Sequence, residues 1–255
     1  IDIKKEAKNP YGAYLLFGEE DYLKRYYASE IRRAVVGDSP YAPFNHILFS
    51  PDNFTAGAAA DALVTPPVFE EKKLIELCAF NFNELKATET SALCDFLEEA
   101  KNYDYAVILI NIPSGALDYG IAKSGKINRP SSLFKALDAA AKTAYFPRAG
   151  LRQLNAWADK HFGTEGIKAG EAELRALISL AGSDMMTLAG EIEKLCAYLH
   201  THGRSQLTEA DIEAICCETG QLEPFGLSNA ILAGDPDSAL AILCRMEEKR
   251  ARPAA

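Results

Sequence analysis

The stretch Tyr105-Ala106-Val107-Ile108-Leu109-Ile110 decides the fold class of this chain. It is a continuous apolar run, and a strand that is apolar on both faces has to be covered on both faces. Strands of this kind occupy the centre of parallel sheets, between two layers of helices. The run therefore predicts a central strand in a three-layer α/β domain.

Strand patterns alternate with helix patterns on both sides of this run. Tyr14-Leu15-Leu16-Phe17 has the pattern of a strand, and Gly18-Glu19-Glu20-Asp21 is a turn and cap into an amphipathic helix. The alternation predicts a parallel sheet of Rossmann or P-loop type over residues 1–147. The remaining expected elements are strands at 47–49, 74–77 and 144–146 and helices at 22–36, 55–64, 84–101 and 131–141.

Strand patterns stop after Pro147, and apolar residues recur at helical spacing instead. The spacing predicts a small helical domain over 148–219, in which Ser183-Asp184 caps one helix and Thr208-x-x-Asp211 is the capping box of another. A further helix pair is expected from about Phe225. Because two helices cannot bury their apolar faces alone, we interpret 220–255 as the start of a third, truncated domain whose remainder is missing or packs on a partner.

Composition limits the class of protein. The chain has 255 residues, 48% of them hydrophobic, and a formal net charge of −9. The acidic balance argues against a protein whose whole surface binds nucleic acid, so protein partners are favoured. No apolar run is long enough to span a bilayer and the start lacks a signal-peptide pattern, which together predict a cytoplasmic protein. The six cysteines have no framework spacing and are expected to be reduced.

The run Thr65-Pro66-Pro67-Val68-Phe69 places two apolar side chains just before four charged residues. Proline suits the first position of a helix, so the run predicts a single helical turn that displays Val68 and Phe69 at the surface. A short apolar knob of this kind is suited to a hydrophobic pocket on another protein. In the alternative interpretation, Phe69 simply covers the local core.

No convincing phosphate-binding loop is present. The turn Gly18-Glu19-Glu20-Asp21 stands where a P-loop would follow the first strand, and its three carboxylates would repel a triphosphate. The segment 120–127 has P-loop spacing but ends in Ile127, which lacks the hydroxyl that binds magnesium. We expect a solvated basic loop there, with the alternative that it touches a nucleic-acid backbone through Lys123, Lys126 and Arg129.

Other catalytic and metal-binding patterns are weak. A helix end and a later helix carry histidines and cysteines that could imitate a zinc site, namely Cys196, His200, His202, Cys216 and Cys217. Histidines near the negative end of a helix dipole need no metal to explain them, and the cysteines are typical of core residues. We therefore expect no metal, no cofactor and no catalytic residues.

Several motifs, taken in order, resemble the delta subunit family of the bacterial DNA polymerase III clamp loader. The strand that runs into Gly18-Glu19-Glu20-Asp21 resembles the family's opening, and Pro66-Pro67-Val68-Phe69 is similar to its clamp-binding element. The resemblance covers residues 14–246. Its later motifs are Gly182-Ser183-Asp184, Leu188-x-x-Glu191-Ile192-x-Lys194-Leu195, Leu207-Thr208-x-x-Asp211-Ile212 and Phe225-x-Leu227-x-x-Ala230-Ile231-x-x-Gly234-Asp235-x-x-x-Ala239-Leu240.

The resemblance implies an AAA+ fold with a helical lid at 148–219 and the start of a helical collar at 220–255. It implies a subunit without ATP hydrolysis that binds the ring-shaped sliding clamp and helps to open it on primed DNA, with Val68 and Phe69 as the wedge. Val68 departs from the larger aliphatic residue that is common in the family. Implied partners are the beta clamp and, through the collar, the gamma/tau and delta-prime subunits, in the cytoplasmic, nucleoid-associated replisome. The alternatives are a delta-prime-like or other AAA+ loader subunit, or an ATP-binding P-loop NTPase.

Overall fold

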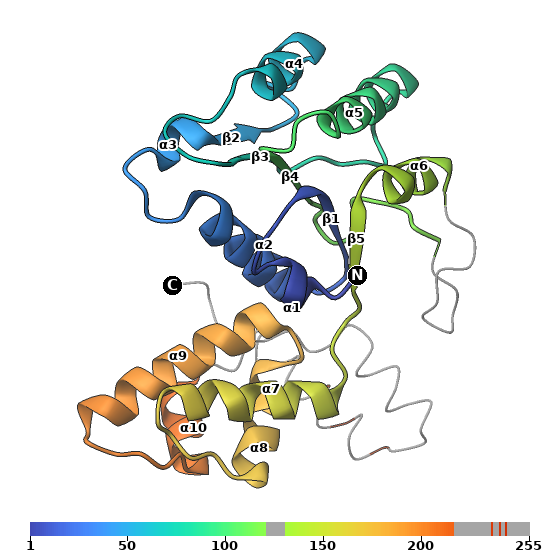
Figure 1. Ribbon diagram of the computed structural model, residues 1–255. Coiled ribbons are helices and arrows are strands. Elements are labelled where there is room, and N and C mark those ends of the chain that lie inside the picture. The colour runs from blue at the N-terminus through green and yellow to red at the C-terminus, as the bar shows by residue number, and fades with distance from the viewer. Residues whose placement is uncertain (121–130, 217–235, 237–239, 241–242, 244–255) are drawn as a thin grey trace. The chain divides into compact units, whose positions relative to one another are not determined.

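The computed structural model describes residues 1–120, 131–216, 236, 240 and 243 (Figure 1). The chain divides into two compact units, Ile1–Arg148 and Ala149–Ala255. The expected boundary after Pro147 falls close to this division, whereas the further boundary expected at 219/220 lies outside the described residues. In the described residues, no helix is both long enough and apolar enough to cross a bilayer.

The first unit is built around a five-stranded parallel sheet with the order β2-β3-β4-β1-β5. The central run is β4, paired with β3 on one side and β1 on the other, with Leu15 opposite Ile110 in the β1–β4 pairing. All expected strands are present and differ from their expected bounds by one or two residues. The strands are β1 (Gly12–Gly18), β2 (His46–Phe49), β3 (Lys73–Leu77), β4 (Ala106–Asn111) and β5 (Lys142–Phe146).

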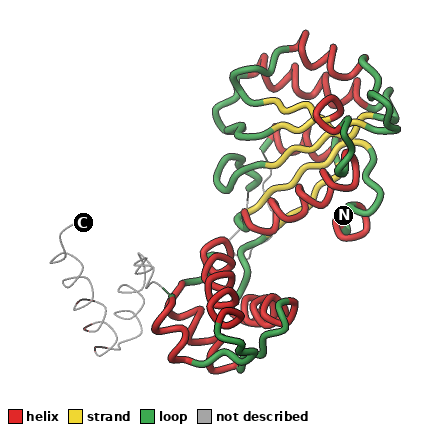
Figure 2. The backbone as a smooth tube through the Cα atoms, turned by 90° about the vertical axis from the view of Figure 1, so that its left-hand side faces the viewer, coloured by secondary structure: helices red, strands yellow, loops and turns green. Residues whose placement is uncertain are grey.

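Helices cover both faces of this sheet, as the continuous apolar run predicts (Figures 1 and 2). On one face, Ile108 and Ile110 of β4 pack in a core shared with α4, α5 and α6. On the other face, Val107 and Leu109 pack in a second core shared with α1 and α2. The helices are α1 (Ile3–Glu6), α2 (Asp21–Val36), α3 (Ala42–Asn45), α4 (Ala56–Val64), α5 (Ala87–Ala100) and α6 (Ser132–Ala140).

The second unit is helical in its described part. The expected capping residues act as predicted: the Asp184 side chain accepts a hydrogen bond from the Thr187 N–H, and Thr208 and Asp211 form the capping box of α10. The buried core is formed by regularly spaced residues such as Leu154, Ala158 and Phe162. The helices are α7 (Leu151–Thr164), α8 (Glu171–Ala181), α9 (Met185–Thr201) and α10 (Glu209–Ile215).

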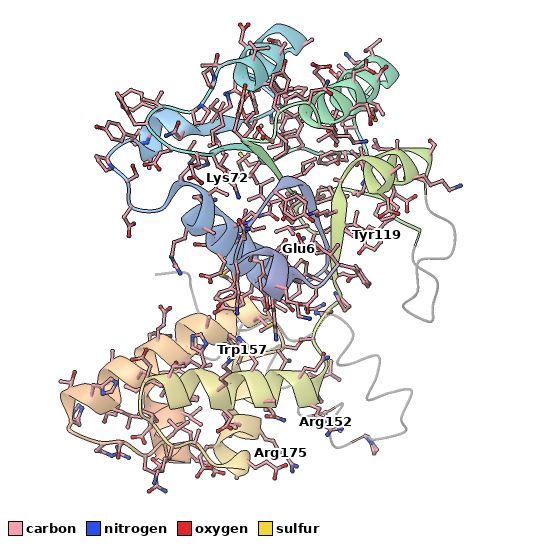
Figure 3. All side chains as sticks on the ribbon, viewed as in Figure 1. Glu6, Lys72, Tyr119, Arg152, Trp157 and Arg175 are labelled. Atoms are coloured by element: carbon pink, nitrogen blue, oxygen red, sulfur yellow. The ribbon has the colours of Figure 1, made fainter. Side chains whose placement is uncertain are left out.

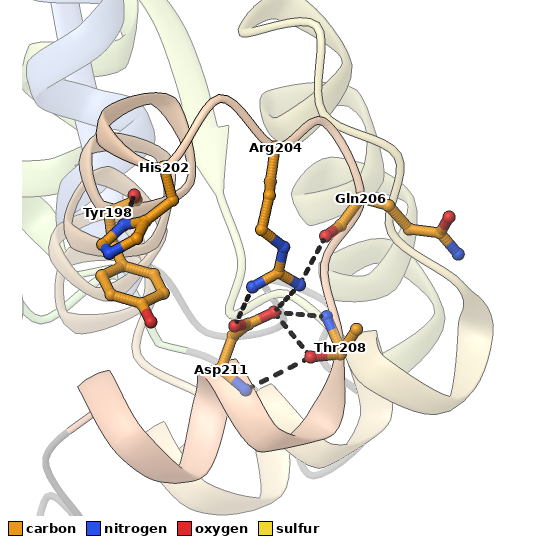
Figure 4. A network of polar contacts seen from close by, with 6 residues as sticks. All are labelled: Tyr198, His202, Arg204, Gln206, Thr208 and Asp211. Carbon is orange, nitrogen blue, oxygen red and sulfur yellow. Dashed lines mark hydrogen bonds and ion pairs between the residues drawn. The ribbon is translucent and has the colours of Figure 1, made fainter.

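An ion pair reinforces the start of α10 (Figure 4). The Arg204 guanidinium donates to both carboxylate oxygens of Asp211, at 2.6 and 2.8 Å, and the same carboxylate accepts from the N–H and the hydroxyl of Thr208. These hydrogen bonds, led by the one from Arg204, lower the pKa of Asp211 to about 2. The carboxylate therefore joins the loop after α9 to the first turn of α10.

Candidate functional site

The knob segment, residues 65–72, connects α4 to β3 and has Phe69 at its tip. The Phe69 side chain is 81% exposed, so the alternative in which this ring covers the local core is wrong. The Phe69 backbone is left-handed, with φ of 54°. The ring lies 4.8 Å from the ring of Tyr41, centroid to centroid, at an interplanar angle of 44°. An aromatic side chain is thus held in solvent on an unusual backbone.

The expected helical turn at Val68 and Phe69 is wrong, because none of residues 65–72 is helical and the chain bends at 68–71. A side chain takes the place of the helical hydrogen bonds. The Asn45 amide lies fully buried beside the segment, where its Nδ2 donates to the Val68 carbonyl at 2.9 Å and its Oδ1 accepts from the Val68 N–H at 2.7 Å. With both of its peptide groups bound to one side chain, Val68 cannot continue a helix, and the left-handed φ of Phe69 turns the chain away.

The turn after β1, where a P-loop would bind phosphate, is closed by the chain itself. Lys24 of α2 is fully buried, and its ammonium donates to the carbonyls of Gly18 at 2.7 Å and Ile112 at 2.6 Å and pairs with Asp21 at 2.8 Å. The Glu20 N–H donates to the Phe146 carbonyl. The lysine and this N–H are therefore occupied by protein groups and are not directed at a ligand.

Gly18 fits this closed turn because it lacks a side chain. Its φ is 119°, and a Cβ at this position would lie 2.2 Å from the Phe146 carbonyl oxygen. The glycine is thus explained by the close approach of β5, without a phosphate.

Aromatic side chains pack beside the same turn. The Glu19 carboxylate accepts hydrogen bonds from the hydroxyls of Tyr119 at 2.9 Å and Tyr145 at 3.3 Å, and both rings pack on Phe17. Burial, reinforced by the Glu19 carboxylate, raises the pKa of the Tyr119 hydroxyl far above its ordinary value (Figure 3 labels this residue). The position next to the turn is thus filled by a negative charge and by tyrosines that remain protonated.

The other candidate sites differ in how far the structure describes them. Gly120 is the only described residue of the segment 120–127, and Lys123, Lys126 and Arg129 lie outside the described residues. The described part of the chain contains no group of three or more His, Cys, Asp or Glu side chains placed to hold a metal. Cys217 lies outside the described residues.

Other contacts occupy several residues of the zinc-like pattern. His200 pairs with Glu165 at 3.7 Å, and His202 Nδ1 lies 2.8 Å from the Tyr198 carbonyl. Burial raises the pKa of the Cys196 thiol to about 11, as is typical of a structural cysteine.

A known bacterial protein is similar in sequence to this chain along nearly its whole length. The chain is 25% identical over 262 residues to the DNA polymerase III subunit delta of Bacillus subtilis (strain 168), an alignment that covers 98% of this chain and 69% of the relative. The resemblance to the delta subunit family is confirmed. No family model matches the sequence.

A solved structure supports the fold. The Bacillus subtilis DNA clamp loader delta protein superimposes with a TM-score of 0.57 at 23% identity, over 99% of this chain and 72% of that one. Together with the strand order of the parallel sheet, this confirms the predicted AAA+-like α/β fold.

The sequence indicates an exposed Phe69 as one of two interpretations, and it carries no signal for the residues that hold the knob segment. Asn45 lies in α3, a helix of four residues, which is too short to give a periodic signal. Lys24 also went unnoticed, because a lysine on an amphipathic helix is normally expected at the surface. In the sequence, neither residue carries a signal that reveals its buried partners.

Proposed function

We propose that this chain acts as a delta-type clamp-loader subunit that binds a ring-shaped sliding clamp through Val68 and Phe69 and helps to open it on primed DNA. The observation that carries the proposal is the 81% exposure of Phe69, on a segment whose backbone is hydrogen-bonded to the buried Asn45 side chain. A large aromatic side chain in solvent has apolar surface to bury in a partner's pocket. The similarity to a DNA polymerase III subunit delta and to a DNA clamp loader delta protein supports a sliding clamp as the partner.

Val68 has a smaller part in this proposal. Its side chain is half-buried and its backbone is bound to Asn45, so it forms the base of the knob, with Phe69 as the tip. The two charged residues that follow Phe69, Glu70 and Glu71, are exposed and keep the segment in solvent when no partner is bound.

The remaining parts of the proposal concern the assembled loader. Contacts with gamma/tau and delta-prime subunits are assigned to the collar region at 220–255, and DNA-backbone contacts to Lys123, Lys126 and Arg129. The subunit would bind clamp without a catalytic site, cofactor or metal of its own, as one component of the DNA polymerase III holoenzyme. Its place would be the bacterial cytoplasm, at the nucleoid-associated replisome.

The test is the affinity of the full chain for the sliding clamp of the same organism. Phe69→Ala should weaken binding by roughly 2 kcal/mol or more, because hot-spot aromatics at interface centres lose at least this much on truncation. Val68→Ala should have a smaller effect. Tyr26→Ala, which removes another exposed aromatic ring from α2, is the control and should leave the affinity unchanged. Wild-type affinity in well-folded Phe69→Ala would remove this residue from the clamp contact.

A further inference from the structure

The knob segment is held by side chains from several elements. Asn45 of α3 binds both peptide groups of Val68, and Ser39, in the loop before α3, donates from its hydroxyl to the Glu70 carboxylate. Lys72 donates its ammonium to the Asn9 side chain and the Pro10 carbonyl, both at 2.9 Å (Figure 3 labels this lysine). These contacts bind the segment beside its tip and at its end.

The start of the segment is fixed as well. The Lys73 ammonium, at the first position of β3, donates to the Thr65 carbonyl. The Tyr105 hydroxyl donates to the Leu63 carbonyl at 2.9 Å, at the end of α4. Pro66 comes directly after Thr65, and its ring restricts the backbone of both residues. Little freedom is left on either side of the tip.

Of these contacts, the one from Asn45 controls the tip most directly. Its amide donates from Nδ2 to the Val68 carbonyl and accepts at Oδ1 from the Val68 N–H, so both peptide planes around Val68 are fixed. The next residue is Phe69, whose left-handed φ of 54° is unfavourable for an aromatic side chain. Such a conformation persists only where the surrounding structure imposes it. Asn45 is the fully buried polar group in position to impose it.

We propose that Asn45 is a positioning residue, which holds the Phe69 ring outward before the partner arrives. The inference rests on the proposed function, since it assigns a role within the same binding segment. A segment ordered in advance loses less conformational entropy on binding. If only a fraction of molecules presents the ring outward, the apparent affinity falls by that fraction. Asn45 therefore supports affinity without touching the partner.

The test compares full-length Asn45→Ala with wild type for binding to the sliding clamp of the same organism. We expect affinity to fall about tenfold, mainly through a slower association rate, since the contacts of the correctly oriented ring are unchanged. Asn83→Ala is the matched control, because the Asn83 amide bridges Gly115 and Asp118 in another loop of the same unit, with hydrogen bonds of 2.9 and 2.7 Å. This control should bind like wild type.

A double-mutant cycle with Phe69→Ala separates positioning from a general structural effect. In the Phe69→Ala background, Asn45→Ala should cost less than twofold, because no ring remains to be positioned. An equal loss in both backgrounds would overturn the inference. Wild-type affinity in folded Asn45→Ala, with Phe69→Ala still weak, would overturn it while leaving the proposed function standing. Wild-type affinity in Phe69→Ala would instead overturn the proposed function.

A measurement on the unaltered chain keeps the inference testable should Asn45→Ala fail to fold. The Val68 N–H donates to buried Asn45 Oδ1 at 2.7 Å, so its hydrogen exchange should be at least a hundredfold slower than that of an unstructured peptide amide. Exchange of the Val68 amide at the rate of an unstructured peptide would show that the segment is not held, and would overturn the inference.

Discussion

At the scale of single residues, the backbone of Phe69 has an energetic cost that is separable from its ring. A left-handed conformation costs an ordinary residue roughly 1–2 kcal/mol, whereas glycine adopts it readily. The ring itself is mostly in solvent, with one contact to Tyr41. Folding stability therefore depends on the backbone at this position more than on the side chain.

Phe69→Ala and Phe69→Gly should differ in stability accordingly. We expect Phe69→Ala to change the free energy of unfolding by less than about 1 kcal/mol, since little buried surface is lost. Phe69→Gly should be up to about 1 kcal/mol more stable than Phe69→Ala, because glycine adopts the left-handed backbone without strain. The greater chain entropy of glycine in the unfolded state offsets part of this gain. Urea denaturation at matched m-values measures both. A loss of 3 kcal/mol or more in Phe69→Ala would indicate a core role.

Lys73, at the first position of β3, makes the folding stability depend on pH. The side chain is 1% exposed, and burial lowers its pKa from 10.5 to about 8. Because the folded pKa is below the unfolded one, the unfolded state binds more protons between pH 8 and 10.5, and stability from this group rises with pH in that window. Below pH 8 the cost of burying the charged ammonium is present in full.

Comparison of wild type with Lys73→Met isolates this contribution. Between pH 7.5 and 9.5, the unfolding free energy of wild type should rise relative to that of Lys73→Met. The lowering of the Lys73 pKa from 10.5 to about 8 sets an upper limit of about 3 kcal/mol on this rise. Chemical denaturation of both proteins at these two pH values is the measurement. Parallel pH profiles would show that Lys73 has an ordinary pKa in the folded chain.

At the scale of elements, the start of α10 depends on Asp211. The folded carboxylate has a pKa of about 2 against an ordinary 3.8, so its stabilisation is complete above pH 4 and is lost as pH falls through 2. Asp211→Asn removes the ion pair with Arg204 and weakens the capping box (Figure 4). We expect a loss of about 1–3 kcal/mol in unfolding free energy at pH 7, as for hydrogen bonds to charged groups.

Glu209→Gln is the control for this effect. Glu209 lies one position into the same helix but is exposed, so its replacement should cost less than about 0.5 kcal/mol. Thermal and urea unfolding of both variants at pH 7 and pH 3 measure the difference, which should narrow at the lower pH. Equal stability of the two variants at pH 7 would mean that the Arg204–Asp211 pair contributes nothing net.

Elements with a clear hydrophobic period could be predicted from sequence, and short or irregular ones could not. The apolar run at 105–110 predicted β4 to within one residue, and the helical spacing of Leu154, Ala158 and Phe162 lies within α7. α1 and α3 were missed, since four residues make little more than one turn and show no period. The backbone of Phe69 was mispredicted because prolines suit a helix start as well as a bend.

In the candidate site, too, local features could be predicted from the sequence and long-range contacts could not. The four charges after Phe69 favoured an exposed ring but left the core alternative open, and the 81% exposure decides between them. The buried contact that holds the segment could not be predicted, because Asn45 and Val68 are separated by 23 residues and meet only through the pairing of β2 with β3. Tertiary contacts of this kind depend on the register of two strands, which no local pattern contains.

At the scale of the whole molecule, the first unit has the layout of a nucleotide-binding sheet while its own side chains occupy the expected phosphate position. Lys24 binds the Gly18 and Ile112 carbonyls, and the Glu20 N–H donates to β5. A phosphate would have to displace these bonds and approach the Glu19 carboxylate. The fold is therefore used here without the donors that make it bind nucleotide elsewhere.

The full chain should accordingly neither bind nor hydrolyse ATP. Placing a triphosphate beside Glu19 adds charge repulsion where a P-loop offers N–H donors and a free lysine, and the buried Lys24 ammonium cannot turn outward without leaving two carbonyls unpaired. Calorimetry with millimolar ATP and magnesium should give no heat of binding, and phosphate release should equal the buffer blank. Micromolar binding would show that the turn after β1 opens to admit nucleotide. It would also place the chain with the nucleotide-binding members of its fold, because the Lys24 contacts would then have to break within the folded state.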